Sequence, residues 1–193
     1  GILHVDAHCD LRDAYEGFEF SHASIMFNVL RDVPQVTKIA QVAVRDFSES
    51  EAALAASSGR IATFDDLSLA AALFRGETWD AQCRRIVDAL PQEVYVSFDI
   101  DALTFENCPH TGTPVSGGLT FNQAVWLLDT LTRSGRRIIG FDVVEVCPTS
   151  GSTPSRAPAC SGNSAGRPSS QTNHKTTDRC DFFRCTAGFA SDT

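Results

Sequence analysis

The stretch Ile2–Asp10, ILHVDAHCD, joins a short apolar strand to a run of charged side chains. Asp6, His8 and Asp10 stand at positions i, i+2 and i+4 of this run. At the end of an extended strand, side chains with this spacing project to one side. Carboxylates and imidazole are common metal ligands. The stretch therefore predicts a strand with a ligand cluster at its carboxyl end.

A second stretch, EVYVSFDID at residues 93–101, repeats the arrangement. Its β-branched and aromatic residues predict a strand, and Asp99 and Asp101 follow at i and i+2. Two such strand ends side by side would place these carboxylates beside Asp6, His8 and Asp10. So many carboxylates cannot stay ionised together in a low-dielectric crevice without a cation. Carboxylate ligation with one histidine favours a pair of hard divalent ions such as Mn²⁺. The alternative is that all five residues are ordinary strand-end turn formers.

Strand and helix patterns alternate along the first 148 residues. Strands are expected within residues 2–5, 37–44, 60–64, 93–101 and 136–146. The strand within 136–146 is expected to be buried. Helices are expected from residue 21, at 48–57 and in one or two pieces across 65–90. This alternation predicts an α/β fold with three layers, α/β/α, and a mostly parallel sheet. Ligands of such folds gather outside the carboxyl ends of the strands.

The helix expected from Thr120 carries its own start and stop signals. Thr120 and Gln123 form a capping box, and Gly135 can end the helix in the left-handed conformation. Val125, Leu128 and Leu131 are predicted to share its buried face.

Composition narrows the class of protein. The chain has 193 residues, of which 42% are hydrophobic, and this predicts one domain with a buried core. Its formal net charge of -8 argues against a nucleic-acid partner. No apolar run reaches the roughly 18 residues of a membrane helix. Seven scattered cysteines suit reduced thiols, and we expect a cytoplasmic protein without a membrane partner.

The sequence changes character at Thr149. Residues 149–193 are rich in Ser, Thr, Pro and Gly, and we expect a disordered tail behind a partial catalytic domain at 1–148. A flexible interaction segment is the alternative interpretation of the tail. A shifted reading frame near Thr149 would also produce so abrupt a change.

Four blocks, HVDAHCD, SFDIDAL, TGTPVSGGL and GFDVVEV, resemble in order and spacing the signature blocks of the ureohydrolases. These are the arginase and agmatinase family of binuclear manganese enzymes. The resemblance covers residues 1 to about 148. It implies the arginase-like fold, incomplete in this chain, and hydrolysis of a guanidino group to urea and an amine. It also implies that the intact protein is a homo-oligomer.

The resemblance also implies a ligand set for two Mn²⁺ ions. Asp6 and Asp99 correspond to the carboxylates that bridge both ions. Asp10 corresponds to a ligand of the first ion, and His8 and Asp101 to ligands of the second.

Three residues correspond to catalytic groups of the family. Asp10 is expected to pass a proton to the departing amine, and His22 stands where the family keeps a proposed proton shuttle. Glu145 matches the glutamate that holds the substrate guanidinium. Two of these assignments have plainer alternatives. His22 could be a helix cap or a surface residue, and Glu145 could be a solvated charge at a strand end. His4 is expected to be a strand residue with its own hydrogen bond.

The chain also departs from the family. The family's further histidine ligand, in a Gly-Gly-x-His block, would lie before Gly1, so we expect sequence to be missing upstream. Arginases carry Ser-Gly-Asn before the shuttle histidine, whereas residues 16–22 read EGFEFSH, which favours agmatine or a related compound over arginine. The loop Cys108–Leu119 is expected to line the mouth of the active site or to be a plain connection. An inactive metal-binding or interaction module, an arginase and a formimidoyl-group hydrolase remain alternative functions.

Overall fold

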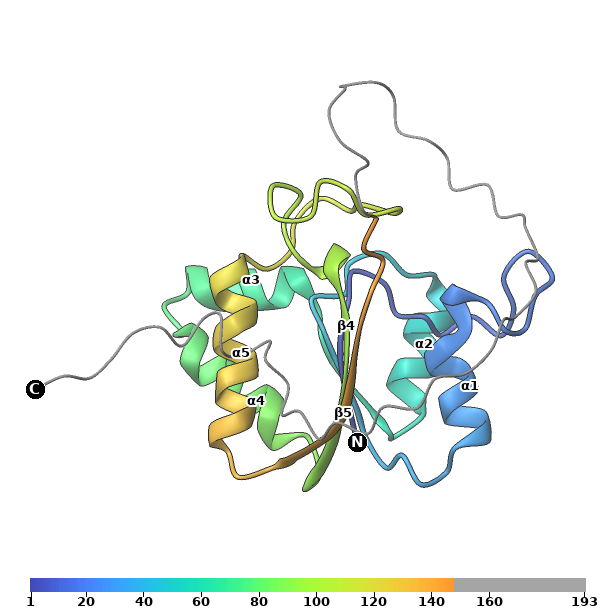
Figure 1. The fold of residues 1–193 in the computed structure, drawn as a ribbon, viewed down its shortest axis with the longest axis horizontal. Coiled ribbons are helices and arrows are strands. Elements are labelled where there is room, and N and C mark those ends of the chain that lie inside the picture. The colour runs from blue at the N-terminus through green and yellow to red at the C-terminus, as the bar shows by residue number, and fades with distance from the viewer. Residues whose placement is uncertain (148–193) are drawn as a thin grey trace, which may run out of the picture. The chain divides into compact units, whose positions relative to one another are not determined.

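The computed structural model describes residues 1–147 (Figure 1). The predicted tail, residues 149–193, lies outside them. The described part contains one five-stranded sheet in which every pair is parallel, in the order β3-β2-β1-β4-β5. The strands are β1 (Ile2–Val5), β2 (Ile39–Val42), β3 (Ile61–Phe64), β4 (Glu93–Asp99) and β5 (Arg137–Val144). The predicted parallel sheet is confirmed.

Helices cover both faces of this sheet, which confirms the three-layer α/β/α fold. On one face lie α1 (Ile25–Asp32) and α2 (Glu49–Ser57). On the other lie α3 (Asp66–Phe74), α4 (Trp79–Asp88) and α5 (Phe121–Arg133). The stretch 65–90 is thus two helices. A short 3₁₀ turn, His22–Ser24, precedes α1, and a second, Ile100–Ala102, follows β4.

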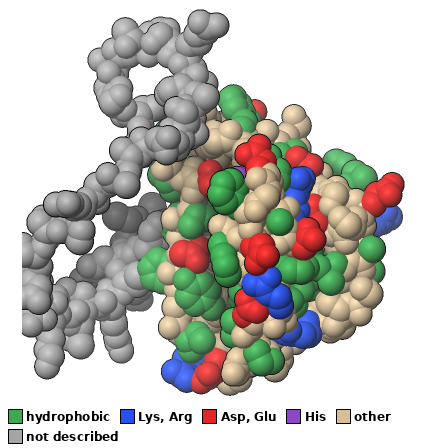
Figure 2. Space-filling model, turned by 90° about the vertical axis from the view of Figure 1, so that its right-hand side faces the viewer, with side chains coloured by type: hydrophobic (Ala, Val, Ile, Leu, Met, Phe, Trp, Pro, Cys, Tyr) green, Lys and Arg blue, Asp and Glu red, His purple; other side chains and the backbone are tan. Residues whose placement is uncertain are grey.

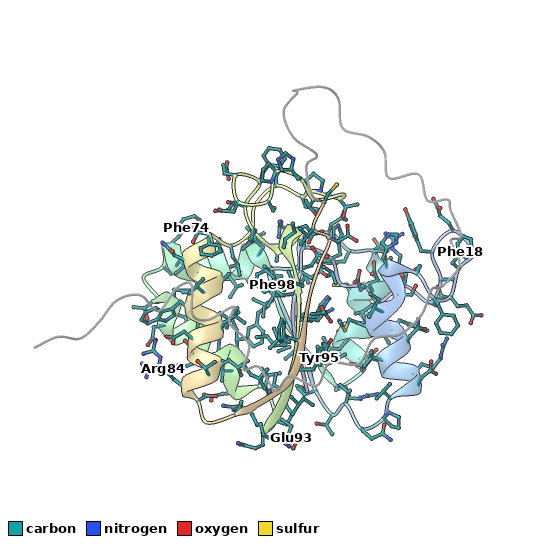
Figure 3. The ribbon with its side chains drawn as sticks, viewed as in Figure 1. Phe18, Phe74, Arg84, Glu93, Tyr95 and Phe98 are labelled. Atoms are coloured by element: carbon teal, nitrogen blue, oxygen red, sulfur yellow. The ribbon has the colours of Figure 1, made fainter. Side chains whose placement is uncertain are left out.

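Each face of the sheet has its own apolar core. Leu3, Val5 and Val96 pack with α3, α4 and α5, whereas Ile2 and Ile39 pack with α1 and α2. Tyr95 and Phe98 of β4 point to opposite sides of the sheet (Figure 3), Tyr95 toward the α1–α2 core and Phe98 toward the other. Side-chain alternation along the strands therefore fills both layers.

The order of the strands creates a switch point between β1 and β4. From β1 the chain adds β2 and then β3 on one side, and it returns to place β4 and β5 on the other side of β1. In open parallel sheets, ligands bind outside the carboxyl ends of the two strands at which the order reverses. Those two strands are followed by Asp6, His8 and Asp10 and by Asp101, with Asp99 as the last residue of β4.

The start and stop signals of α5 are confirmed. Thr120 and Gln123 form both hydrogen bonds of the capping box, and Gly135 has φ 79° just after the helix. The predicted buried face is only partly right. Leu131 is buried and Leu128 packs against the core, but the other fully buried positions are Ala124 and Leu127. Val125 is half-buried and lies outside the core cluster, because the core-facing stripe is centred on Ala124, Leu127 and Leu131.

The expectation that β5 is a buried strand is wrong for one of its faces. Ile139, Phe141 and Val143 are exposed. Within residues 1–147 no strand pairs with the far side of β5, so it is an edge strand of the described sheet. An apolar edge of this kind is a site at which chains can associate.

The face built by α1 and α2 carries acidic and basic side chains among apolar ones (Figure 2). No helix among the described residues is long and apolar enough to cross a membrane.

Candidate metal centre

Two groups of side chains at the switch point could each hold a metal ion. One consists of His4, Asp6 and Asp10, and the other of Asp6, His8 and Asp101. Within each group the candidate ligand atoms lie within 4.8 Å of one another. Asp6 belongs to both groups, which is the arrangement that a carboxylate shared between two ions requires. Asp99 belongs to neither, so its bridging role stays a prediction.

Asp6 is held by contacts to both of its carboxylate oxygens. Its Oδ2 lies 2.8 Å from His4 Nε2, and its Oδ1 accepts a hydrogen bond of 2.6 Å from the backbone N–H of His8. His8 Nδ1 lies 3.4 Å from the same Oδ1. The carboxylate is buried, and these contacts fix its orientation at the end of β1.

Hydrogen bonds across the switch point join the two ligand stretches. The backbone N–H of Ala7 donates to Asp101 Oδ1 at 3.1 Å, and His8 Nδ1 lies 3.1 Å from Asp101 Oδ2. Asp99 Oδ1 accepts the N–H of Asp101 at 2.8 Å, which caps the short turn after β4. The ends of β1 and β4 therefore form one connected polar cluster.

Asp10 is positioned by the start of α1. Its backbone carbonyl accepts hydrogen bonds from Met26 and Phe27, at 3.0 and 3.1 Å, which are otherwise unpaired donors of the first helical turn. The side chain of the N-cap residue, Ser24, makes no capping hydrogen bond to the helix, since its Oγ pairs with Ser21 Oγ at 2.7 Å, so the Asp10 carbonyl acts in its place. Asp10 has φ 54°, a conformation that costs a non-glycine residue on the order of 1–3 kcal/mol and often occurs at functional sites.

The metal-free cluster is electrostatically crowded. Burial, and then the charges of Asp6 and Asp101, raise the pKa of the Asp99 carboxyl to about 9. Burial and the charge of Asp6 raise the pKa of Asp10 to about 7. Hydrogen bonds to Asp101 and Asp6 raise the pKa of His8 to about 10. Burial opposes ionisation of Asp6, but His4 and then His8 outweigh it and hold its pKa well below the ordinary range.

This donor set fits divalent cations. Three buried carboxylates and the half-buried Asp10 lie close together, and so many negative charges at close range require compensating positive charge. A bound cation supplies that charge and inverts the pKa pattern. Carboxylate oxygens with imidazole suit Mg²⁺ or Mn²⁺ better than a soft metal. Cys9 belongs to neither group and is buried among the apolar residues Ile2, Leu11 and Met26.

The loop Cys108–Leu119 borders the cluster. Thr113 Oγ1 donates to Asp101 Oδ2 at 3.3 Å, and a Cβ added to Gly112 would lie 3.2 Å from Glu145 Oε2. Arg45 Nη2 donates to the carbonyl oxygens of Asp101, at 2.7 Å, and Val115, at 3.0 Å. These contacts favour the expectation that the loop lines the site. Arg45 and Thr113 were missed by sequence reasoning, since neither stands in a ligand-like spacing.

The other two predicted catalytic residues lie outside both groups. His22 is exposed, begins the 3₁₀ turn before α1 and contacts the Tyr15 ring edge-to-face at 5.4 Å between ring centroids. Glu145 is exposed just after β5, beside Gly112, with φ 57°. Their catalytic roles stay predictions. His4 makes its expected hydrogen bond.

Comparison with known proteins identifies similar sequences. The sequence model of the arginase family matches residues 1–161. The chain is 35% identical over 148 residues to N(1)-aminopropylagmatine ureohydrolase of Thermus thermophilus, covering 76% of this chain and 46% of the relative. It is 36% identical over 142 residues to an agmatinase of Pyrococcus horikoshii, covering 73% and 45%.

A solved structure shares the fold. The proclavaminate amidino hydrolase of Streptomyces clavuligerus superposes with a TM-score of 0.64 at 25% identity, covering 77% of this chain and 47% of that one. The chain thus spans less than half the length of these proteins.

Proposed function

The chain belongs to the arginase family, and we propose that its residues build the binuclear manganese centre of a ureohydrolase. The proposed reaction is hydrolysis of a guanidino group to urea and an amine. Because the chain spans less than half the length of the relatives, this is the activity of the enzyme to which these residues contribute. The observation that carries the proposal is the pair of ligand groups that share Asp6 at the switch point.

The residues of the cluster are proposed to bind the metal ions and to transfer a proton. Asp6, His8, Asp10, Asp99 and Asp101 hold the ions. Two Mn²⁺ ions bound there supply a water of lowered pKa and stabilise negative charge on the substrate. Asp10, a carboxylate of the same cluster, is proposed to take up a proton and pass it to the departing amine.

Substrate binding is assigned to groups at the rim of the cluster. The carboxylate of Glu145 offers the two-oxygen geometry that a planar guanidinium recognises. A Cβ added to Gly112 would lie 3.2 Å from Glu145 Oε2, so the loop Cys108–Leu119 borders this carboxylate. His22 is proposed as the proton shuttle to solvent, which suits its exposed position.

Agmatine or a related linear guanidino compound is the substrate we propose. The stretch EGFEFSH lacks the Ser-Gly-Asn run of arginases, and Glu16 and Glu19 add negative charge that suits a cationic tail. The two relatives compared above are named for agmatine and an aminopropyl derivative of it. Arginase activity and formimidoyl-group hydrolysis are the alternatives that a substrate panel distinguishes.

The test is urea release by the purified 193-residue chain from agmatine, guanidinobutyrate and arginine, with and without added Mn²⁺. Asp99→Asn removes a buried charge of the centre, and Asp13→Asn makes the same change at an exposed carboxylate as the matched control. We expect Mn²⁺-dependent urea from the wild type and from Asp13→Asn, with agmatine preferred, and none from Asp99→Asn.

Urea release that ignores Mn²⁺ or survives Asp99→Asn would contradict the proposal. If no substrate gives urea while Mn²⁺ still binds, this chain is the inactive metal-binding module of the second hypothesis.

A further inference from the structure

Glu51 is a buried carboxylate that the proposed reaction does not use. It lies in the first turn of α2, is 4% exposed and accepts hydrogen bonds at both oxygens. Oε2 accepts the backbone N–H and the hydroxyl of Ser48, both at 2.8 Å, and Oε1 accepts the backbone N–H of Leu11 at 3.1 Å. Burying a carboxylate is costly unless its oxygens are paired in this way. The two oxygens of Glu51 thus serve two different parts of the chain.

The capping box of α5 shows that one oxygen is enough to cap a helix. There Gln123 Oε1 alone accepts both the backbone N–H and the hydroxyl of Thr120, each at 2.9 Å. Glu51 Oε2 makes the same two contacts with Ser48 at the start of α2. Glutamate and glutamine both occur at this position of a capping box. The second oxygen of Glu51 is therefore not needed for the cap, and its contact with Leu11 has a separate role.

The N–H that Glu51 Oε1 binds belongs to the peptide unit between Asp10 and Leu11. The carbonyl of the same peptide unit accepts hydrogen bonds from Met26 and Phe27 in the first turn of α1, at 3.0 and 3.1 Å. One polar group of this peptide is thus held by α1 and the other by α2. Asp10 has φ 54°, a left-handed conformation that persists in a non-glycine residue only when the surrounding contacts hold it.

We infer that Glu51 is a positioning residue of the metal centre, because its second oxygen anchors the peptide that follows Asp10 and holds Asp10 in the left-handed conformation. That conformation places the Asp10 carboxylate in one candidate metal group with His4 and Asp6. The inference rests on the proposed function, in which Asp10 is a ligand. Helix α2 accordingly supports the centre without supplying a ligand to it.

Three substitutions separate the cap from the anchor. Glu51→Gln keeps one oxygen for Ser48, as Gln123 does for Thr120, but turns an NH₂ group toward the N–H of Leu11, which loses its acceptor. Ser48→Ala removes the hydroxyl of the cap and leaves Glu51 Oε1 on Leu11. Glu51→Asp keeps the charge, but its side chain is one carbon shorter and cannot reach Ser48 and Leu11 together.

The conformation of Asp10 can be measured by nuclear magnetic resonance in the metal-free 193-residue chain. The one-bond coupling between Cα and Hα is smaller in a residue with positive φ than in one with negative φ. We expect a small coupling for Asp10 in the wild type and in Ser48→Ala, and a larger one in Glu51→Gln and Glu51→Asp. A small coupling in both Glu51 variants, or a large one in the wild type, would overturn the inference. Glu51→Asp decides the question if Glu51→Gln does not fold.

Mn²⁺ affinity, measured by calorimetric titration, shows whether the anchor serves the metal centre. Loss of a contact that orients a ligand typically weakens metal binding about 10-fold to 100-fold. We expect this loss in Glu51→Gln and Glu51→Asp, and the affinity of the wild type in Ser48→Ala. Equal weakening in Ser48→Ala would assign the effect to the cap, and wild-type affinity in Glu51→Asp would assign it to the charge; either result would overturn the inference. If the wild type binds no Mn²⁺, the proposed metal centre fails, and the coupling alone decides whether Glu51 holds Asp10.

Discussion

Replacing Asp99 by Asn should stabilise the metal-free chain, and increasingly so as the pH rises. Asp99 is buried, and its Oδ1 accepts the N–H of Asp101. Asn keeps an oxygen for that hydrogen bond but cannot ionise in either the folded or the unfolded chain. Because the carboxyl is crowded by Asp6 and Asp101, it holds its proton in the folded state at a pH at which the unfolded chain has released it.

The size of the effect follows from the pKa. The pKa of Asp99 rises from an ordinary value of 3.8 to about 9 on folding. Stability from this group is therefore present at acid pH and is lost as the pH rises through the window between these two values. Within the window each pH unit is equivalent to about 1.4 kcal/mol. Between about pH 5 and pH 7 the free energy of unfolding of Asp99→Asn should gain about 2.7 kcal/mol on the wild type.

The assay is chemical unfolding in the presence of a chelator, followed by far-ultraviolet circular dichroism at several pH values. Other groups such as Asp10 titrate in both proteins and largely cancel in the difference. Asp13→Asn, at an exposed carboxylate, should show no such divergence from the wild type. A difference between Asp99→Asn and the wild type that stays constant or shrinks with pH would refute the reasoning.

Three further predictions concern the fold. Leu127→Ala removes a fully buried side chain from the α3–α5 core and should cost about 2–5 kcal/mol of unfolding free energy in urea titrations; a cost near zero would contradict the packing. Thr120→Ala removes the capping box of α5 and should cost about 0.5–2 kcal/mol in the same titrations, and an unchanged midpoint would contradict the cap. Burial raises the pKa of the thiols of Cys9 and Cys83 to about 12. After treatment of the native chain with an alkylating reagent at neutral pH, mass spectrometry should find both thiols unmodified and the exposed Cys147 modified. Equal labelling of all three would contradict the burial of Cys9 and Cys83.

Sequence reasoning located the strands well because their composition is unambiguous. Buried parallel strands require apolar, β-branched runs, and ILHV and EVYVSFD supply them. The ligand stretches at their carboxyl ends then follow from topology. Pattern alone placed Asp6, His8, Asp10, Asp99 and Asp101 at one edge of the sheet, and the structure groups four of them.

Burial on β5 could not be predicted from the same kind of pattern. An apolar run predicts a buried strand, but burial depends on what lies on the far side, and the described residues place nothing there. The buried face of α5 was also only approximate, because residues one position apart on a helix lie about 100° apart and two neighbouring stripes can both look apolar.

The tertiary contacts of the centre have no signal in the sequence. Gln41 meets His4 only because β2 pairs in register beside β1, with His4 opposite Gln41. Arg45 reaches the carbonyl of Asp101 across more than 50 residues of sequence. The left-handed conformation of Asp10 is set by the amides at the start of α1. Such contacts depend on register and loop geometry, which residue spacing does not encode.

The most direct test of the metal centre is Mn²⁺ titration of the metal-free chain, with bound metal counted by elemental analysis after gel filtration. Asp6→Asn is the decisive variant because Asp6 is the one residue common to both ligand groups, and Asp13→Asn is its matched control. We predict that the wild type and Asp13→Asn bind Mn²⁺ and that Asp6→Asn loses binding at both sites. Binding by Asp6→Asn that equals the wild type, or no binding by any of the three, would contradict the account.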